Sequence, residues 1–175
     1  MNIGLIGYRG AGKSTVGRRL ASRLQRKFVD TDNLIEEHQG ARISEIVKSH
    51  GWGYFRAIEK RIIEEVSKED HLIIATGGGA VLDNGNLRSL KKNGLIIWLK
   101  ADQQVLLRRM DQDPRTNANR PTLTGKGILD ELGEMVEIRS PFYEKASDVQ
   151  LDTSTLDIEA VVERVLSIIE ERMGT

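Results

Sequence analysis

The stretch GYRGAGKS, residues 7–14, decides the fold, because it is a glycine-rich turn that leaves an apolar strand and enters an amphipathic helix. It matches G-x-x-x-x-G-K-[ST], a pattern in which successive backbone N–H groups converge on phosphate oxygens. The following helix adds its free amides and the positive end of its dipole. In this pattern Lys13 reaches the terminal phosphates of a nucleotide, and Ser14 offers a hydroxyl to Mg²⁺. The sequence therefore predicts a nucleotide site formed by Gly10, Ala11, Gly12, Lys13, Ser14 and Thr15.

Beyond this loop, short apolar runs alternate with longer amphipathic stretches. Runs such as LIIA at 72–75 are continuously apolar rather than alternating, which suits parallel strands covered on both faces. The stretches between them are long enough for helical crossovers. We therefore expect an α/β sandwich. Its strands are predicted at 3–6, 28–29, 72–75, 95–99 and 149–151, and its helices at 14–24, 53–67, 103–110, 128–145 and 156–173.

Length and composition restrict the function classes. The 175 residues fit a single domain, 1–175, and the 26 Lys and Arg balance the 26 Asp and Glu, so no broad basic field for nucleic acid is expected. Disulfides, thiolate nucleophiles and thiolate metal sites are excluded because the chain has no cysteine. No leader pattern and no run of about 20 apolar residues is present. We expect a soluble, cytoplasmic monomer with small-molecule partners.

One segment, residues 111–127, breaks the alternation of apolar and amphipathic stretches. Its sequence, DQDPRTNANRPTLTGKG, has almost nothing apolar to bury. Loops of this length are uncommon in a compact domain and usually serve as lids or binding segments. We expect a mobile lid, with a disordered insertion as the alternative.

Two carboxylates follow the second predicted strand, in FVDTDNLI. Asp30 and Asp32 are two residues apart, so they project to the same side if the strand continues through them. At the carboxyl end of a parallel strand they lie where open α/β sheets bind ligands. One is then available to Mg²⁺ and the other to an acceptor hydroxyl. The alternative is that Asp32 caps a helix, a use that we do not expect for Asp30.

A second ligand-facing loop is predicted at TGGG, residues 76–79, because three glycines after a strand allow close approach to the backbone. Two arginines from other segments, Arg56 and Arg139, offer planar donor forks that suit a carboxylate. For Arg56 the alternative is an ordinary surface ion pair with Glu59, one helical turn away.

Together these residues resemble the shikimate kinase family, and the resemblance spans essentially the whole chain. It rests on six ordered motifs, GYRGAGKST, DTD at 30–32, FR at 55–56, TGGG at 76–79, RP at 120–121 and R-x-P-x-Y at 139–143. The resemblance implies a P-loop fold like that of nucleoside monophosphate kinases, a three-layer sandwich with a five-stranded parallel sheet and a lid. It also implies transfer of the terminal phosphoryl group of ATP to the 3-hydroxyl of shikimate, which yields shikimate 3-phosphate for chorismate and aromatic amino-acid biosynthesis.

The resemblance also implies a role for each matching residue. Lys13 and Ser14 serve the phosphates and Mg²⁺, and Asp30 helps to hold the metal through water. Asp32 contacts the acceptor hydroxyl, and Arg120 arrives with the lid to bind the phosphates and to stabilise the phosphoryl group in transit. The residues implied to hold shikimate are Asp32, Arg56, Gly78, Gly79 and Arg139.

The sequence departs from the family pattern at Trp52, where an acidic residue is common, so the support of the acceptor pocket is expected to differ. The arginine that stacks on adenine is left open among Arg108, Arg109 and Arg115. Three other functions also stay open: a kinase of another small hydroxy acid such as gluconate, a nucleoside monophosphate kinase, and a nucleotide-binding regulatory module without catalysis.

Overall fold

The chain, as a computed structural model, is described over residues 1–113 and 128–174. Its sheet has five strands in the order β2-β3-β1-β4-β5, and every pair is parallel, as the continuous apolar runs predict. β1 is the middle strand, with Ile3 opposite both Ile73 of β3 and Leu95 of β4. The strands are β1 (Asn2–Ile6), β2 (Lys27–Asp30), β3 (Leu72–Ala75), β4 (Gly94–Lys100) and β5 (Val149–Asp152).

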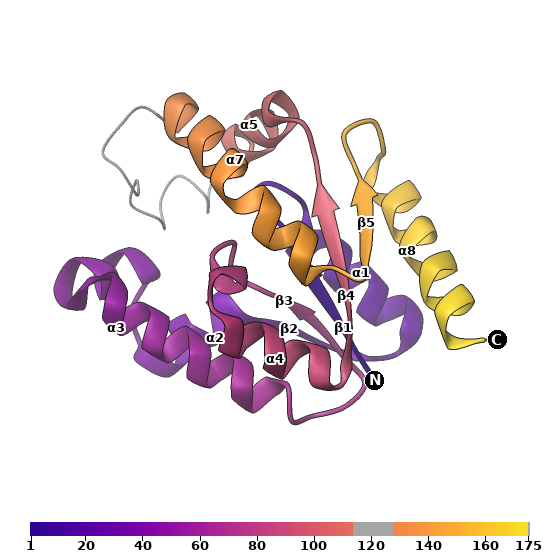
Figure 1. Cartoon of the computed structure of the whole chain (residues 1–175), viewed down its shortest axis with the longest axis horizontal. Helices are drawn as coiled ribbons and strands as arrows, with labels where there is room; N and C mark the ends of the chain where they lie inside the picture. The colour runs from indigo at the N-terminus through magenta and orange to yellow at the C-terminus, as the bar shows by residue number, and fades with distance from the viewer. Residues whose placement is uncertain (114–127, 175) are drawn as a thin grey trace.

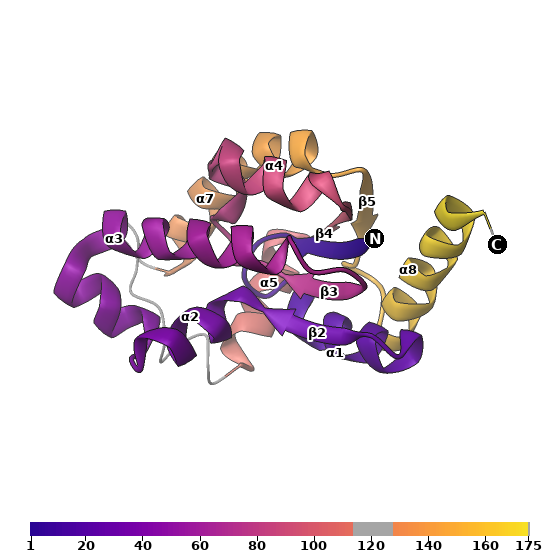
Figure 2. The same cartoon turned by 90° about the horizontal axis from the view of Figure 1, so that it is seen from below.

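Helices cover both faces of this sheet and make three layers, with α1 and α8 on one face and α3, α4 and α7 on the other (Figure 1; Figure 2). The helices are α1 (Lys13–Leu24), α2 (Thr31–Gln39), α3 (Ile43–Val66), the 3-10 turn η1 (Ala80–Leu82), α4 (Asn84–Lys92), α5 (Gln103–Asp111), α7 (Ile128–Ala146) and α8 (Ile158–Met173).

Neighbouring residues of a strand face opposite sides of the sheet, so each strand supplies two apolar cores. Ile73 packs in the core under α1 and α8, whereas Ile74 packs in the core under α3, α4 and α7. Because both faces are buried, every position of a strand such as LIIA is apolar.

A third apolar cluster lies away from the sheet, between α2 and the first part of α3. This α2–α3 cluster consists of Ile35, Ile43, Ile46, Phe55, Ile58 and Ile62. The sequence predicted only the part of α3 after residue 53, and α2 was not among the predicted helices. For α3 the boundary follows from Gly51, whose non-helical backbone (φ 81°, ψ 170°) divides the helix at a kink.

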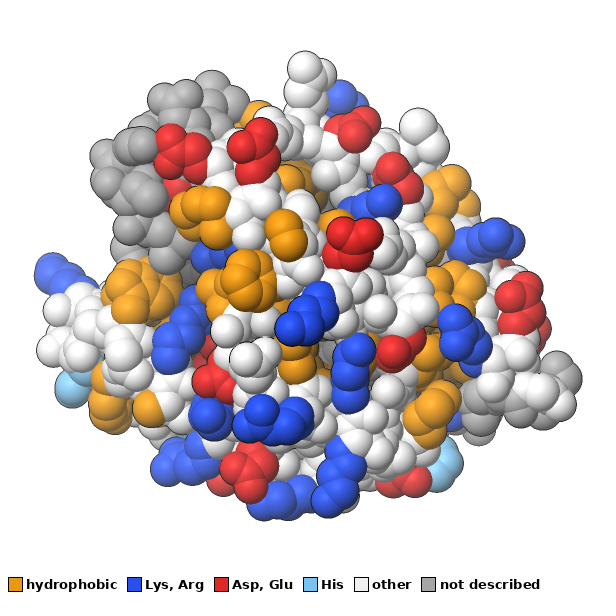
Figure 3. Space-filling model, viewed as in Figure 1, with side chains coloured by type: hydrophobic (Ala, Val, Ile, Leu, Met, Phe, Trp, Pro, Cys, Tyr) orange, Lys and Arg blue, Asp and Glu red, His pale blue; other side chains and the backbone are white. Residues whose placement is uncertain are grey.

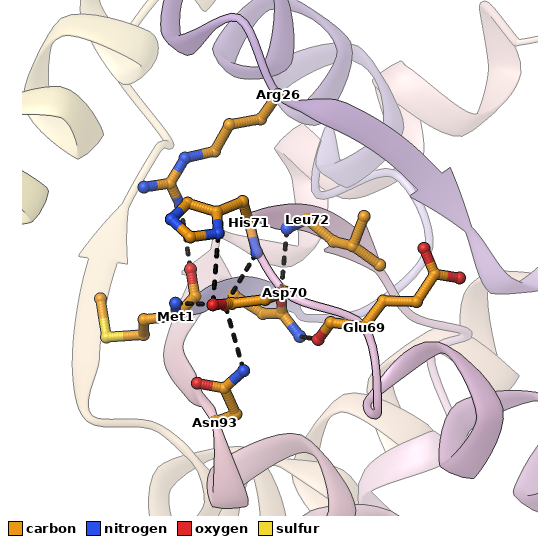
Figure 4. Close-up of polar contacts among 8 residues, drawn as sticks. Met1, Arg26, Glu69, Asp70, His71, Leu72 and Asn93 are labelled. Carbon is orange, nitrogen blue, oxygen red and sulfur yellow. Dashed lines mark hydrogen bonds and ion pairs between the residues drawn. The ribbon is translucent and has the colours of Figure 1, made fainter.

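Asp70 anchors a polar cluster at the amino-terminal edge of the sheet, beside β1 and β3 (Figure 4). It accepts hydrogen bonds from the amino group of Met1, from the His71 N–H at 2.8 Å and from Asn93 Nδ2 at 3.1 Å. The Met1 amino group, first, and the His71 N–H hold the pKa of the Asp70 carboxyl well below its ordinary range. These bonds join the start of β1 to the loop that enters β3.

On the surface, acidic and basic side chains occur together across the face seen in Figure 3. Over the described ranges, no helix has both the length and the apolar character needed to cross a membrane. The predicted lid, residues 111–127, lies outside the described residues from residue 114 onward.

Candidate active site

The phosphate-binding loop, residues 7–12, connects the end of β1 to the start of α1. Gly10 and Gly12 adopt positive φ angles of 81° and 88°, which glycine accepts without strain. Lys13, the first residue of α1, is buried with only 9% of its surface exposed. Its Nζ donates to the carbonyl oxygens of Gly7 at 2.8 Å and Tyr8 at 2.9 Å. The cation is therefore held against the loop itself.

The amino end of α1 is open to a ligand, because its N-cap residue is Gly12, which has no side chain to cap the first backbone N–H groups. A cavity of about 930 Å³ adjoins it. The free amides and the helix dipole at such an end favour an anion. The predicted site residues that line this cavity are Gly10, Ala11, Gly12, Lys13, Ser14, Thr15, Asp30, Asp32 and Gly78.

Asp30 corrects one prediction, because it does cap a helix. β2 ends at Asp30, whose carboxylate accepts from the backbone N–H of Asp32 at 3.1 Å and of Asn33 at 3.4 Å. The second carboxylate oxygen of Asp30 accepts a hydrogen bond from Ser14 Oγ at 2.5 Å. One side chain thus fixes the start of α2 and meets the hydroxyl of the phosphate-binding loop.

Asp32 lies in the first turn of α2 rather than on the strand, so the reasoning from strand alternation was wrong. The helical turn nevertheless brings its carboxylate to the same cavity as Asp30. The glycine loop after β3 passes close to it, since a Cβ at Gly77 would lie only 2.7 Å from Asp32 Oδ1. Both carboxylates therefore lie at the carboxyl edge of the sheet, beside the loop.

The glycine loop, residues 76–79, is fixed by neighbours from three elements. The Thr76 N–H donates to the Leu5 carbonyl at 3.2 Å, and the Gly77 N–H donates to Thr31 Oγ1 at 3.2 Å. The carbonyl of Gly78 accepts from the hydroxyl of Tyr143, in α7, at 2.5 Å. The loop is thus held in place while its glycine surface stays uncovered by side chains of its own.

Arg139, in α7, is the less exposed of the two predicted acceptor arginines, with 7% of its surface exposed. A Cβ at Gly78 would lie 3.5 Å from Arg139 Nη1, so the guanidinium borders the glycine loop. Its guanidinium carbon is 5.4 Å from the centre of the Tyr8 ring. Among the described residues no carboxylate forms an ion pair with Arg139. It is therefore a buried cation that can accept an anionic ligand.

Arg56 lies on the other side of the glycine loop, where a Cβ at Gly79 would be 2.7 Å from its Cζ. Its Nη1 is 2.5 Å from Glu59 Oε2. The predicted alternative of an ordinary surface ion pair was wrong, because only 1% of the Glu59 side chain is exposed. Trp52, the departure from the family pattern, places its ring 5.6 Å from the Arg56 guanidinium carbon. Arg56 is therefore supported by a buried carboxylate and an aromatic face.

Glu59 is a site residue that sequence reasoning missed, although its spacing from Arg56 was visible. Burial raises the pKa of the Glu59 carboxyl, and the neighbouring Arg56 opposes that rise. Glu59 Oε1 has no hydrogen-bond partner among the described residues. Only the tertiary structure reveals the burial that distinguishes Glu59 from the other glutamates of α3.

Replacing Glu59 with glutamine is expected to change how stability depends on pH. With its pKa raised, folded Glu59 keeps its proton to higher pH than unfolded Glu59. The wild type is therefore expected to lose stability, relative to Glu59→Gln, as pH rises from the ordinary carboxyl range through the raised pKa. Urea unfolding of both proteins across this pH range measures the difference. A constant difference would contradict the prediction.

Arg109 and Thr153 also line the cavity. Arg109 donates to Thr153 Oγ1 at 3.0 Å and to the Thr153 carbonyl at 2.8 Å. Of the three arginines left open for adenine, Arg109 therefore lines the cavity and Arg115 lies outside the described residues. Arg120 also lies outside them.

The chain is similar to known proteins over almost its whole length. The family model described as shikimate kinase matches residues 9–170. The shikimate kinase of Syntrophus aciditrophicus (strain SB) is 39% identical over 173 residues, covering 94% of this chain and 89% of the relative. That of Caldanaerobacter subterraneus subsp. tengcongensis is 41% identical, covering 94% of each. A solved structure of shikimate kinase from Acinetobacter baumannii in complex with shikimate has a TM-score of 0.91 and 33% identity, covering 98% of this chain and 93% of that one.

Proposed function

Because the chain belongs to the shikimate kinase family, we propose how its residues divide the work of moving a phosphoryl group from ATP to shikimate. The chain is a kinase that phosphorylates shikimate with ATP as the donor. We propose the 3-hydroxyl of shikimate as the accepting atom and shikimate 3-phosphate as the product. The observation that carries the proposed acceptor site is the buried Arg139 cation beside the glycine loop.

The acceptor side is proposed to bind shikimate through its single carboxylate. Arg139 and Arg56 border the glycine loop from two different helices, so their donor forks can converge on one anion. Arg139 has no carboxylate partner among the described residues, and its burial strengthens the attraction to a bound anion. Gly78 and Gly79 let the ring of the acceptor approach the backbone.

The donor side is proposed to hold ATP along the phosphate-binding loop. The open end of α1 offers N–H groups to the phosphates, and Lys13 offers a cation beside them. Ser14 Oγ and Asp30 Oδ2 lie 2.5 Å apart, and both are oxygen atoms of the kind that bind Mg²⁺. Mg²⁺ is commonly held by one or two protein oxygens together with substrate phosphates, and this pair fits that arrangement. When bound, Mg²⁺ neutralises charge on the phosphates. Arg109 is proposed to border adenine, since it lines the cavity together with Thr153, to which it donates.

Phosphoryl transfer asks mainly for alignment and for neutralised charge. Asp32 is proposed to orient the acceptor hydroxyl and to accept its proton, because its carboxylate lies beside the glycine loop and Asp32 lines the same cavity as the phosphate-binding loop. Lys13 is proposed to stabilise the charge on the transferring group. The role that the resemblance gives to Arg120 stays a prediction.

Product formation by the purified protein tests this proposal. ATP and Mg²⁺ are supplied with shikimate, gluconate or a nucleoside monophosphate, and mass spectrometry and NMR identify the product and the phosphorylated position. We expect conversion of shikimate alone, at the 3-hydroxyl. Phosphorylation of gluconate or of the nucleotide in preference to shikimate would leave the phosphate-binding loop assigned and overturn the acceptor site. Binding of both substrates without turnover would instead favour a regulatory module.

Asp30→Asn separates the two roles of Asp30. Asparagine is also a good helix cap, so α2 should keep its start, whereas the negative charge toward Mg²⁺ is lost. The Mg²⁺ concentration for half-maximal rate is expected to rise by about 10- to 100-fold, as when a metal-site partner is removed. Calorimetry of ADP binding at several Mg²⁺ concentrations checks this without turnover. An unchanged Mg²⁺ requirement would leave Asp30 as a cap only.

Three further expectations belong to the same proposal: that residues 1–175 act as one domain, that the enzyme is a monomer and that it works in the cytoplasm. Light scattering at several protein concentrations measures the molar mass of the protein in solution. A dimer mass would overturn the monomer.

A further inference from the structure

Tyr8, the second residue of the phosphate-binding loop, has two guanidinium groups near its ring. Its ring is buried, with 3% of the residue exposed. The guanidinium carbon of Arg9 is 5.7 Å from the ring centre and that of Arg139 is 5.4 Å from it. Both distances are within the range of a cation–π contact, which is stronger when the groups are desolvated. The Tyr8 carbonyl accepts from Lys13, but neither the motif nor the proposed mechanism gives the Tyr8 side chain a task.

We propose that Tyr8 is a positioning residue of the acceptor site, whose ring face holds the Arg139 guanidinium and ties it to the phosphate-binding loop. This inference rests on the proposed role of Arg139. Among the described residues, no hydrogen bond or ion pair holds the Arg139 guanidinium, and the Tyr8 ring is an aromatic face against which it packs beside the glycine loop. An arginine held in advance loses less side-chain freedom when a carboxylate binds.

A second contact between the same two segments supports this arrangement. Arg9 Nη2 is 3.1 Å from Glu131 Oε1, and only 1% of the Glu131 side chain is exposed. Glu131 and Arg139 both belong to α7, so consecutive residues of the loop, Tyr8 and Arg9, each contact this helix. The loop that holds the donor is thereby joined to the helix that carries the acceptor arginine.

The aromatic face, rather than the hydroxyl, carries the proposed role. The Tyr8 hydroxyl is buried and has no hydrogen-bond partner among the described residues. Phenylalanine keeps the ring face and removes only that hydroxyl, whereas leucine removes the ring. The pair Tyr8→Phe and Tyr8→Leu therefore separates the contact with Arg139 from the mere filling of the core.

Steady-state kinetics with each substrate varied in turn tests the inference. Tyr8→Leu is expected to raise KM for shikimate about tenfold, the size of a desolvated cation–π contact. KM for ATP and kcat are expected to stay within about threefold of the wild type, because the contact with Arg139 would help to bind the acceptor equally in the ground state and the transition state. Tyr8→Phe is expected to keep KM for shikimate within about twofold of the wild type. If Tyr8→Leu fails to fold, Tyr8→Met, which fills the space flexibly, takes its place.

A matched control is Phe28→Leu, which removes a comparable contact elsewhere, since the Arg18 guanidinium carbon is 5.2 Å from the Phe28 ring centre. Its KM for shikimate should not change.

Arg139→Ala is measured in parallel. If Arg139→Ala raises KM for shikimate and Tyr8→Leu does not, the inference is wrong and the acceptor site stands. If neither raises it, the acceptor assignment fails and the inference with it. Equal increases in Tyr8→Leu and Phe28→Leu, or in Tyr8→Phe and Tyr8→Leu, would also overturn the inference.

Discussion

Lys13→Ala is expected to lower kcat by roughly 10³-fold, the upper range for removing one charged or hydrogen-bonding group from a preorganised site. The Lys13 ammonium is buried and is held by two loop carbonyls at 2.8 and 2.9 Å, so its place beside the phosphate-binding loop is fixed before a nucleotide binds. Charge that develops on the transferring group would lose its fixed partner in the variant. Single-turnover measurement of product formation gives the chemical step directly.

The Lys13→Ala protein must be shown to fold, because the substitution also leaves the Gly7 and Tyr8 carbonyls without their donor. Circular dichroism and calorimetric binding of shikimate check the fold and the acceptor site. Lys27→Ala is the matched control, since its ion pair with Glu69 is exposed, with 67% and 52% of the side chains accessible. A kcat within tenfold of the wild type for Lys13→Ala would remove Lys13 from the reacting centre.

Arg139→Ala is expected to raise KM for shikimate by about 10²-fold, because the loss of one partner from a buried charge pair is costly. KM for ATP should change far less. Arg139 borders the glycine loop at Gly78 and has 7% of its surface exposed. An arginine on the protein surface could therefore not take over its contact with a bound carboxylate in the variant. Initial rates over a wide range of shikimate concentrations, with ATP saturating, measure the effect.

The control for Arg139→Ala is Arg23→Ala, which removes an exposed pair with Glu163 between α1 and α8. Exposed pairs contribute little to stability, so its rates and its unfolding midpoint should match the wild type. If shikimate affinity were unchanged in Arg139→Ala, Arg139 would not bind the acceptor.

The sheet and the phosphate-binding loop could be predicted because their signals are local. β3 and most of β4 are short continuous apolar runs, and the loop joins glycines and a lysine within one motif next to a strand and a helix. The order of the strands has no local signal. The strand order depends on the side of β1 to which each helical connection carries the next strand, and the sequence alone did not predict it.

The details of the acceptor side were harder to predict, because they depend on where elements end and on what they meet. Asp30 is a helix cap only because β2 ends there, a boundary that the strand pattern leaves uncertain. Glu59 looks like any helical glutamate until the glycine loop covers it. Tyr8 and Arg139 are far apart in the sequence, so their contact carries no sequence signal.

The separate α2–α3 cluster has a consequence for engineering. Its six apolar residues pack with one another, apart from the two cores that line the sheet. Substitutions in this cluster would change the packing around Arg56. The core under α1, which supports the phosphate-binding loop, consists of other residues. In the proposed acceptor site these six positions bear on Arg56 alone, since the Phe55 ring lies 5.2 Å from its guanidinium carbon, whereas Arg139 and the glycine loop belong to other elements. Conservative apolar substitutions there would be expected to alter how Arg56 meets the acceptor and to leave the Arg139 side of the site unchanged.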